Sequence, residues 1–427
     1  MKYCSTLVIG LGIWDLPLGA LARECSTTES EQILQLTSPD QLDVFEGCTI
    51  ITGHIAIEPS YSGDLILNGV TEFPGNISTS GDSPLGLGLV ELPNLVELGA
   101  VNLSSVANVH LPKLERAVDI VLVQPGRSGE VDLGSLVEAN NVKIRGSWTS
   151  INVSSLQTVG QVAQFCGSQF CRMNSNEEYP FISVDLPELV TTNYLELGVS
   201  VESVSVPLLE VIGHQEPEVQ HVQGLTLNIL ENTGKDLDFN APKLHTINGT
   251  LEVNGGVSGL SLGALNDGSV GITLNSRASP GLNVYSTLKT PRHLYIWGNL
   301  ASIYLPSFDY DGTFGFSIDY INDIPCNETL YNLWQIFPNP SADNYCDEIE
   351  IQDEEPSDEV PEDTDDTTTD TTITDESNNT GAEGTEPQSG NDDNSEEFVS
   401  GDGAGMVLPR GGVTMIAATI ISSWFSF

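Results

Sequence analysis

The sequence predicts an all-β protein, a parallel β-helix or solenoid, on the strength of one repeat. Residues 92–104 match residues 111–123 after a shift of 19 positions, so Leu92-Pro93 falls on Leu111-Pro112. A period of about 20 residues is typical of solenoids. Each copy ends in an apolar-x-apolar pair, and this period of two is a strand pattern.

The same motif recurs through most of the chain. It consists of four positions: an apolar residue, then Pro or a small residue, then any residue, then Leu. Most spacings fall between 19 and 23 residues. The motif begins at Leu92, Leu111, Leu133, Val153, Leu186, Val206, Ala241, Leu262, Tyr285 and Leu305, where Phe308 replaces the closing Leu. Proline cannot donate to a strand ladder, so we place it at the corner of each coil.

Apolar pairs follow in phase and should form the stacked strands. They are Ile55/Ile57, Leu65/Leu67, Val142/Ile144, Leu195/Leu197, Leu225/Leu227, Leu251/Val253, Ile272/Leu274, Leu294/Ile296 and Phe316/Ile318. We expect one side chain of each pair to face the core. Two long gaps indicate insertions, at Cys166–Pro180 and His214–Gln223. A leucine-rich repeat is the alternative solenoid, but the connecting segments are short and β-branched, which favours a β-helix.

The amino terminus predicts a secretory signal peptide over residues 1–22. Lys2 precedes the apolar run Leu7–Trp14, and Ala20-Leu21-Ala22 is a small-residue cleavage site that leaves Arg23 as the mature start. A buried first strand or helix is the alternative. A secreted β-helix would occupy residues 23–347.

Six cysteines beyond Cys4 should form disulfides in an oxidising compartment. Six cysteines allow 15 pairings, which the sequence alone does not distinguish. Our hypothesis is nearest-neighbour pairing, with two disulfides sealing the ends of the solenoid and a third pinning a loop: Cys25–Cys48, Cys326–Cys346 and Cys166–Cys171.

The carboxyl-terminal part of the chain differs in composition from the repeat region. Residues 348–402 are acidic, rich in Thr and Ser, and contain no Lys or Arg, which predicts a disordered, O-glycosylated stalk. Residues 403–427 end in the uncharged stretch Val413–Phe427, which predicts a GPI-attachment signal that is removed. Gly401 is the expected attachment residue, with Asp402 and Ser400 as alternatives, and a tail-anchored helix is the competing interpretation.

The formal net charge of −46 repels phosphate backbones and argues against nucleic-acid binding. Sequons for N-glycosylation occur at Asn76, Asn102, Asn152, Asn248, Asn327 and Asn378. The exposed aromatic residues Tyr194, Tyr285, Tyr295, Trp297 and Tyr304 could form a sugar-stacking or protein-binding patch or pack in the core, and Tyr295 and Trp297 should share one face.

No catalytic group stands out in the sequence. Glu196 and Glu252 alternate with Thr226 and Thr273 on intervening coils, so we expect no ladder of carboxylates such as a glycan-cleaving β-helix enzyme needs. Asp309, Asp311, Asp319 and Asp323 hint at a calcium loop, but its other ligand positions are missing, which favours a solvated edge. The six histidines share no metal-ligand spacing, and two of them, His214 and His221, fall in an insertion.

The signal peptide, the segment Cys48–Val70, the LPxL series, the acidic stalk and the GPI signal together resemble the fungal GPI-anchored cell-wall organisation proteins, whose ectodomain is related to the receptor L-domain. The Gly-rich segment Pro74–Val90 and the insertion with Cys166 and Cys171 depart from that pattern. The resemblance implies a right-handed β-helix ectodomain, a location at the plasma membrane or cell wall, and a role in wall organisation.

The expected protein is therefore a cell-surface glycoprotein, not an enzyme, with no cofactor and no metal. Its partners would be cell-wall glycans or wall proteins, with the membrane reached through the GPI lipid. A receptor-like or adhesive module on the same β-helix is the alternative, and a glycan-active enzyme is a third possibility.

Overall fold

The computed structural model describes residues 22–27, 33–80, 86–171, 180–213, 224–230, 236–266, 270–279, 281–309, 315–320 and 329. They all fall within the first of two compact units, Met1–Asp353 and Glu354–Phe427. They form a parallel β-solenoid of about 11 turns, as the sequence predicts. Among them no helix is long and apolar enough to cross a membrane.

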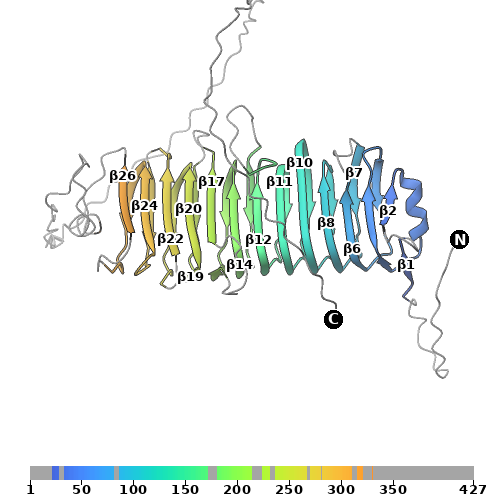
Figure 1. Cartoon of the computed structure of the whole chain (residues 1–427), viewed down its shortest axis with the longest axis horizontal. Helices are drawn as coiled ribbons and strands as arrows, with labels where there is room; N and C mark the ends of the chain where they lie inside the picture. Colours follow the sequence, from blue (N-terminus) through green and yellow to red (C-terminus); the bar gives the residue numbers. More distant parts are fainter. Residues whose placement is uncertain are drawn as a thin grey trace, which may run out of the picture. The chain divides into compact units, whose positions relative to one another are not determined.

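The largest sheet runs the length of the solenoid, and each strand pairs in parallel with the next (Figure 1). Its successive strands are β1 (Glu24–Ser26), β3 (Ile50–Thr52), β6 (Glu72–Thr79), β8 (Glu97–Ser104), β10 (Arg116–Asp132), β11 (Glu138–Asn152), β12 (Thr158–Cys166), β14 (Thr191–Gly198), β17 (Gly224–Ile229), β20 (Gly249–Gly255), β22 (Val270–Ser276), β24 (His293–Gly298) and β26 (Gly315–Tyr320). The strands β2 (Ile33–Leu36) and β4 (His54–Ile57) pair with each other and then with β6. We call the part of this sheet that follows the bend in its long strands, together with β2 and β4, the first face.

A second face carries the strands that lead into each corner. They are β5 (Ser62–Ile66), β7 (Gly86–Glu91), β9 (Asn108–His110), the later halves of β10 and β11, β13 (Ile182–Asp185), β15 (Val201–Ser205), β18 (Leu237–Asn240), β21 (Val257–Leu262), β23 (Leu282–Ser286) and β25 (Leu300–Tyr304). A short third face consists of β1, β3 and the first residues of β6, β8, β10, β11, β12 and β14, continued by β16 (Val211–Ile212) and β19 (Thr246–Ile247).

The LPxL motif forms the corner between the second and third faces. In the first two copies the backbone N–H of Leu95 donates to the carbonyl of Leu92 at 3.2 Å, and that of Leu114 to Leu111 at 3.1 Å. This i+3 to i bond closes a β-turn whose second position is the proline, where its fixed φ is favoured and its missing N–H is not needed. All four leucines are buried, so the motif is at once a turn and a core anchor.

The predicted register is wrong by one residue at a single motif. Tyr285 pairs with Ser261, and Ser286 pairs with Leu262, so the corner begins at Ser286. Ser286 is buried, and its Oγ accepts a hydrogen bond from the N–H of Leu288 at 3.3 Å. The sequence pattern selected the apolar Tyr285, whereas the structure uses a small polar residue whose hydroxyl satisfies the turn.

The apolar pairs whose side chains the structure describes, from Ile55/Ile57 to Leu294/Ile296, fill one continuous core. Val142 and Ile144 are both fully buried, as are Leu195 and Leu197, and each pair aligns with its counterpart on the next strand. The expectation that only one member of each pair faces inward is therefore wrong. Side chains two residues apart on a strand point to the same side, and here that side is the core.

The first and third faces meet at a bend in each long strand. The strand register shifts between Phe73 and Asn76 on β6, and an equivalent shift recurs on β11 and β12. Gly99 lies at the same position on β8, where a Cβ would collide with the carbonyl oxygens of Pro74 and Gly75. Such bulges bend a strand, and here they fold the sheet into a concave corner.

The described amino-terminal end is closed by a disulfide and a short helix. Cys25 on β1 is bonded to Cys48, as predicted, and the 3-10 helix η1 (Pro39–Phe45) lies between them in the chain. The Gln41 side chain accepts a hydrogen bond from the N–H of Ser38 at 3.1 Å, and Phe45 is buried. A second predicted disulfide, Cys166–Cys171, forms where β12 ends and the first insertion begins.

Candidate functional site

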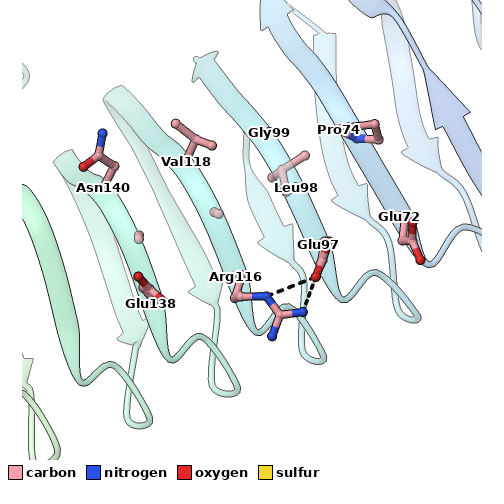
Figure 2. A pocket seen from close by; sticks show the side chains of 11 residues that line it. Glu72, Pro74, Glu97, Leu98, Gly99, Arg116, Val118, Glu138 and Asn140 are labelled. Atoms are coloured by element: carbon pink, nitrogen blue, oxygen red, sulfur yellow. Dashed lines mark hydrogen bonds and ion pairs between the residues drawn. The ribbon is translucent and has the colours of Figure 1, made fainter.

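A groove of about 550 Å³ lies along the concave corner between the first and third faces. It crosses β6, β8, β10 and β11, which at roughly 4.8 Å per strand makes it about 15 Å long. Figure 2 shows charged side chains from the starts of these strands along one edge, with the side chains of the bend beside them. The labelled residues are Glu72, Glu97, Arg116 and Glu138 on the charged edge, and Pro74, Leu98, Gly99, Val118 and Asn140 beside it.

The charged edge is a ladder of register partners. Glu72 pairs with Glu97, Glu97 with Arg116, and Arg116 with Glu138 on consecutive strands. The Nε of Arg116 donates to Glu97 Oε1 at 3.0 Å, and this hydrogen bond and the Glu97 charge raise the pKa of Arg116. The expectation of no carboxylate ladder is wrong here, because Glu72 and Glu97 occupy equal positions on adjacent coils. The apolar pairs of the first face do not reveal this ladder, because its residues lie before the bend, on the third face.

A second polar surface lies farther along the solenoid, on the outward side of the first face. Arg145 Nε donates to Gln164 Oε1 at 2.6 Å, and Gln164 Nε2 donates to Glu196 Oε2, so a hydrogen-bonded chain crosses three strands. Burial raises the pKa of Glu196, which the Gln164 hydrogen bond and the Arg145 charge oppose and the nearby Glu252 charge reinforces. Burial also lowers the pKa of Arg145.

The same surface continues toward β24 as two outward rows, which we call the polar rows. The first row runs Glu196, Thr226, Glu252, Thr273 and Tyr295, and the second runs Asn228, Asn254, Asn275 and Trp297. Within them the amide of Asn254 donates to Glu252 Oε1 at 2.8 Å, and beside them the Tyr194 hydroxyl donates to Thr226 Oγ1 at 3.0 Å. Burial raises the pKa of Tyr194.

The polar rows lead to three aromatic rings on β24, and their register continues onto Ser317 and Asp319 of β26. The His293 and Tyr295 ring centroids lie 4.8 Å apart, and those of Tyr295 and Trp297 lie 5.7 Å apart, so the prediction that Tyr295 and Trp297 share a face is confirmed. Tyr285 and Tyr304 are also stacked, with ring centroids 5.9 Å apart, but they lie on the second face. The aromatic residues singled out in the sequence therefore occupy two faces and not one patch.

Four of the six predicted glycosylation sites lie among the described residues. Asn76, Asn102 and Asn152 are exposed. Asn248 is half-buried, and its side-chain amide donates to the carbonyl of Gly213 at 2.7 Å. Asn76 and Asn102 are therefore open to a glycan, whereas a glycan on Asn248 would compete with that hydrogen bond. A glycan on Asn152 would compete with the hydrogen bond that its amide donates to Asp132 Oδ1 at 2.8 Å.

The other predicted residues lie outside the described part of the chain. They are Cys326, Cys346, Asn327, Asn378, Ser400, Gly401 and Asp402, together with the segments 1–21, 348–402 and 403–427, and with His214, His221, Asp311 and Asp323. Asp309 is exposed. Within the described residues, the ligand atoms of Cys166, Cys171 and Glu196 lie close enough to hold a metal ion, but the two sulfur atoms are joined in a disulfide.

Sequence reasoning missed the groove and the Arg145–Gln164–Glu196 chain. Gln164 and Glu196 are register partners between inward residues, so continuing the predicted register would have aligned them. Arg145 is the partner of Cys166 and reaches Gln164 diagonally, so the register alone would not have placed it. The bend that makes the groove has only a weak signal, a glycine or asparagine four residues after the closing Leu of several motifs, as at Gly99, Asn140 and Gly160. Neither a protein-family model, nor a curated protein, nor a solved structure matches this chain.

Proposed function

We propose that this protein is a structural glycoprotein of the fungal cell surface, secreted, anchored by GPI near Gly401, and active in cell-wall organisation. The observation that carries the proposal is the uninterrupted solenoid, a continuous apolar core with the Cys25–Cys48 disulfide at its described amino-terminal end. Each coil buries its apolar face only against its neighbours, so such an array needs sealed ends to stay soluble.

Three further features support this role. The sequons at Asn76, Asn102 and Asn152 are exposed on the outside of the solenoid, as N-glycans require. The two disulfides suit an oxidising, extracellular compartment. The acidic segment 348–402 and the apolar end 413–427 have the composition of a stalk and an anchor signal. The right-handed, receptor L-domain-like ectodomain and a cap at Cys326–Cys346 belong to the same proposal.

Treating intact cells with phosphatidylinositol phospholipase C, and separately with glucanase, tests the anchor. One of the two enzymes should release the protein, which tells membrane residence from wall residence. A chain ending at Gly412, without the apolar end, should instead appear in the medium. Retention of the wild-type protein after both treatments would contradict the anchor.

The groove favours a second candidate, a receptor-like or adhesive module that holds a ligand against Glu72, Glu97, Arg116 and Glu138. The two functions predict different phenotypes. Cells that carry Arg116→Ala should lose adhesion and keep normal sensitivity to wall-perturbing drugs if the protein is an adhesin. Cells that lack the whole protein should become drug-sensitive if it organises the wall.

A further inference from the structure

We propose that the polar rows and the aromatic rings of β24 form a binding surface for a neutral polysaccharide chain. The proposal deepens the proposed function by naming a glycan as partner and placing its site, and it takes its cell-surface setting from that function. It concerns a surface separate from the groove of Figure 2, which lies on β6, β8, β10 and β11.

The first argument is the aromatic cluster. Trp297 is 38% exposed although it is one of the largest apolar side chains, and it stands at the end of a row of three neighbouring rings. Gly271, the register partner of His293, makes room for the His293 ring, because a Cβ there would collide with it. The glycine thus allows an aromatic platform on an otherwise regular sheet. Exposed rings with a polar edge are suited to surfaces that bind partners of mixed polarity.

The second argument is the chemistry of the rows that lead to the rings. Between β14 and β24 they carry threonine hydroxyls, asparagine amides and the carboxylates of Glu196 and Glu252, which together donate to and accept from the hydroxyls of a sugar. Within each row, neighbouring side chains repeat at roughly 4.8 Å from one coil to the next, so an extended polymer that lies across the strands meets the same kinds of groups on each coil. A chain of hydroxyl-bearing units fits this periodic surface.

The third argument is that these side chains are held before any ligand arrives. Glu252 accepts from Asn254, Thr226 accepts from Tyr194, and Glu196 accepts from Gln164, which in turn accepts from Arg145. Each carboxylate keeps further lone pairs, and each amide keeps a further N–H. Side chains that are already ordered lose little conformational entropy on binding, which favours affinity.

The charge of the rows selects a neutral polymer over the other partners. The rows contain two carboxylates and no Lys or Arg in β14–β24, and the whole chain carries −46, so a polyanionic glycan would be repelled. Protein interfaces have an apolar, aromatic-rich core that is depleted in charge. Here the rings adjoin a hydroxyl, amide and carboxylate surface, which matches a hydrated sugar polymer better than a protein.

Binding is measured by affinity electrophoresis and tryptophan fluorescence on the purified full-length protein. The probes are soluble β-glucan, mannan and chito-oligosaccharides, with heparin as a polyanion. At least one neutral probe should bind, and Trp297→Ala should weaken it about three- to tenfold, the range that one aromatic contact gives. Trp297→Phe should retain most of the affinity. Tyr304→Ala is the control, because the Tyr304 ring is 51% exposed, and so more open to solvent than Trp297, but lies on the second face.

Three results would overturn the proposal: no neutral probe binds at millimolar concentration, heparin binds instead, or Trp297→Ala and Tyr304→Ala weaken binding equally. Circular dichroism establishes that each variant is folded, and Tyr295→Ala serves as a second variant of the same cluster. A negative binding result does not bear on the proposed GPI anchor, because enzymatic release from cells does not depend on Trp297. A failure of the anchor likewise leaves the binding result standing.

Discussion

Gly99 is the residue that allows the concave corner. The carbonyl oxygens of Pro74 and Gly75 occupy the space where a Cβ would stand, and both belong to backbone that cannot move aside. We expect Gly99→Ala to destabilise the protein by about 1–3 kcal/mol through overpacking. Chemical unfolding followed by circular dichroism measures the change.

Gly263→Ala is the control for this prediction. A Cβ at Gly263 would meet only the Tyr285 ring, at 3.1 Å, and Tyr285 is exposed and can shift. The cost there should be well below that of Gly99→Ala. Equal effects at both positions would show that the close backbone approach at the bend does not determine stability.

Glu196 is predicted to make stability depend on pH. Its pKa is raised in the folded protein, chiefly by burial, so the folded state binds its proton more tightly than the unfolded state does. Below the ordinary pKa the carboxyl is protonated in both states, and its burial does not lower the free energy of unfolding. The free energy of unfolding falls as pH rises toward the raised pKa of the folded state. We expect Glu196→Gln to match wild type at pH 4 and to be more stable at pH 7.

The measurement is the difference in melting temperature between Glu196→Gln and wild type across that pH range. Taking the difference cancels the titration of the other carboxylates. The glutamine retains an oxygen that accepts from Gln164, so the hydrogen-bonded chain survives the substitution. A difference that stays constant with pH, or a loss at pH 7, would refute the role of burial at Glu196.

At the scale of the element, each LPxL corner combines a turn and a core anchor, and the two roles can be separated in one copy. Leu114 is fully buried and closes the turn at Leu111, whereas Pro112 is only partly buried. We expect Leu114→Ala to cost about 2–5 kcal/mol because it leaves a cavity. Pro112→Ala should cost under about 1 kcal/mol, because it changes mainly the entropy of the unfolded chain. Urea unfolding midpoints rank the two, and a larger loss at Pro112 would mean that the turn outweighs the core.

The elements that the sequence predicts well are those set by burial. The apolar pairs and the LPxL corners repeat because every coil must fill the same core, so their register is visible without a structure. The bend at Gly99 leaves no apolar trace, since its residues are selected by backbone space. The Glu97–Arg116 contact is accessible from the sequence, because the shift of 19 that aligns residues 92–104 with 111–123 also aligns these two residues. The Glu72–Glu97 pair is hidden, because Glu72 precedes the first LPxL motif at Leu92. Tyr285 shows the opposite error. Its apolar ring fits the motif in the sequence, but in the structure the ring is exposed and Ser286 begins the corner.

At the scale of the molecule, the solenoid is a nearly linear array in which each coil contacts its two neighbours, so stability is local and the ends open first. The chain offers a natural comparison. Cys25–Cys48 closes a loop with a separation of 23 residues at the amino-terminal end, whereas Cys166–Cys171 spans 5 residues at the edge of a central strand. Loop-closure entropy grows with loop length, so the first disulfide should contribute more.

We therefore expect replacement of Cys25 and Cys48 by serine to lower the free energy of unfolding by about 2–4 kcal/mol, a typical value for a native disulfide. The loss should be concentrated at the amino-terminal end of the solenoid. Hydrogen exchange followed by mass spectrometry should show faster exchange in β1 to β4 and unchanged exchange in β17 to β24. Replacement of Cys166 and Cys171 by serine should speed exchange only around β12 and β14. Uniformly faster exchange in the first variant would mean that the solenoid unfolds as one cooperative unit, and that its amino-terminal disulfide stabilises the whole array rather than its end.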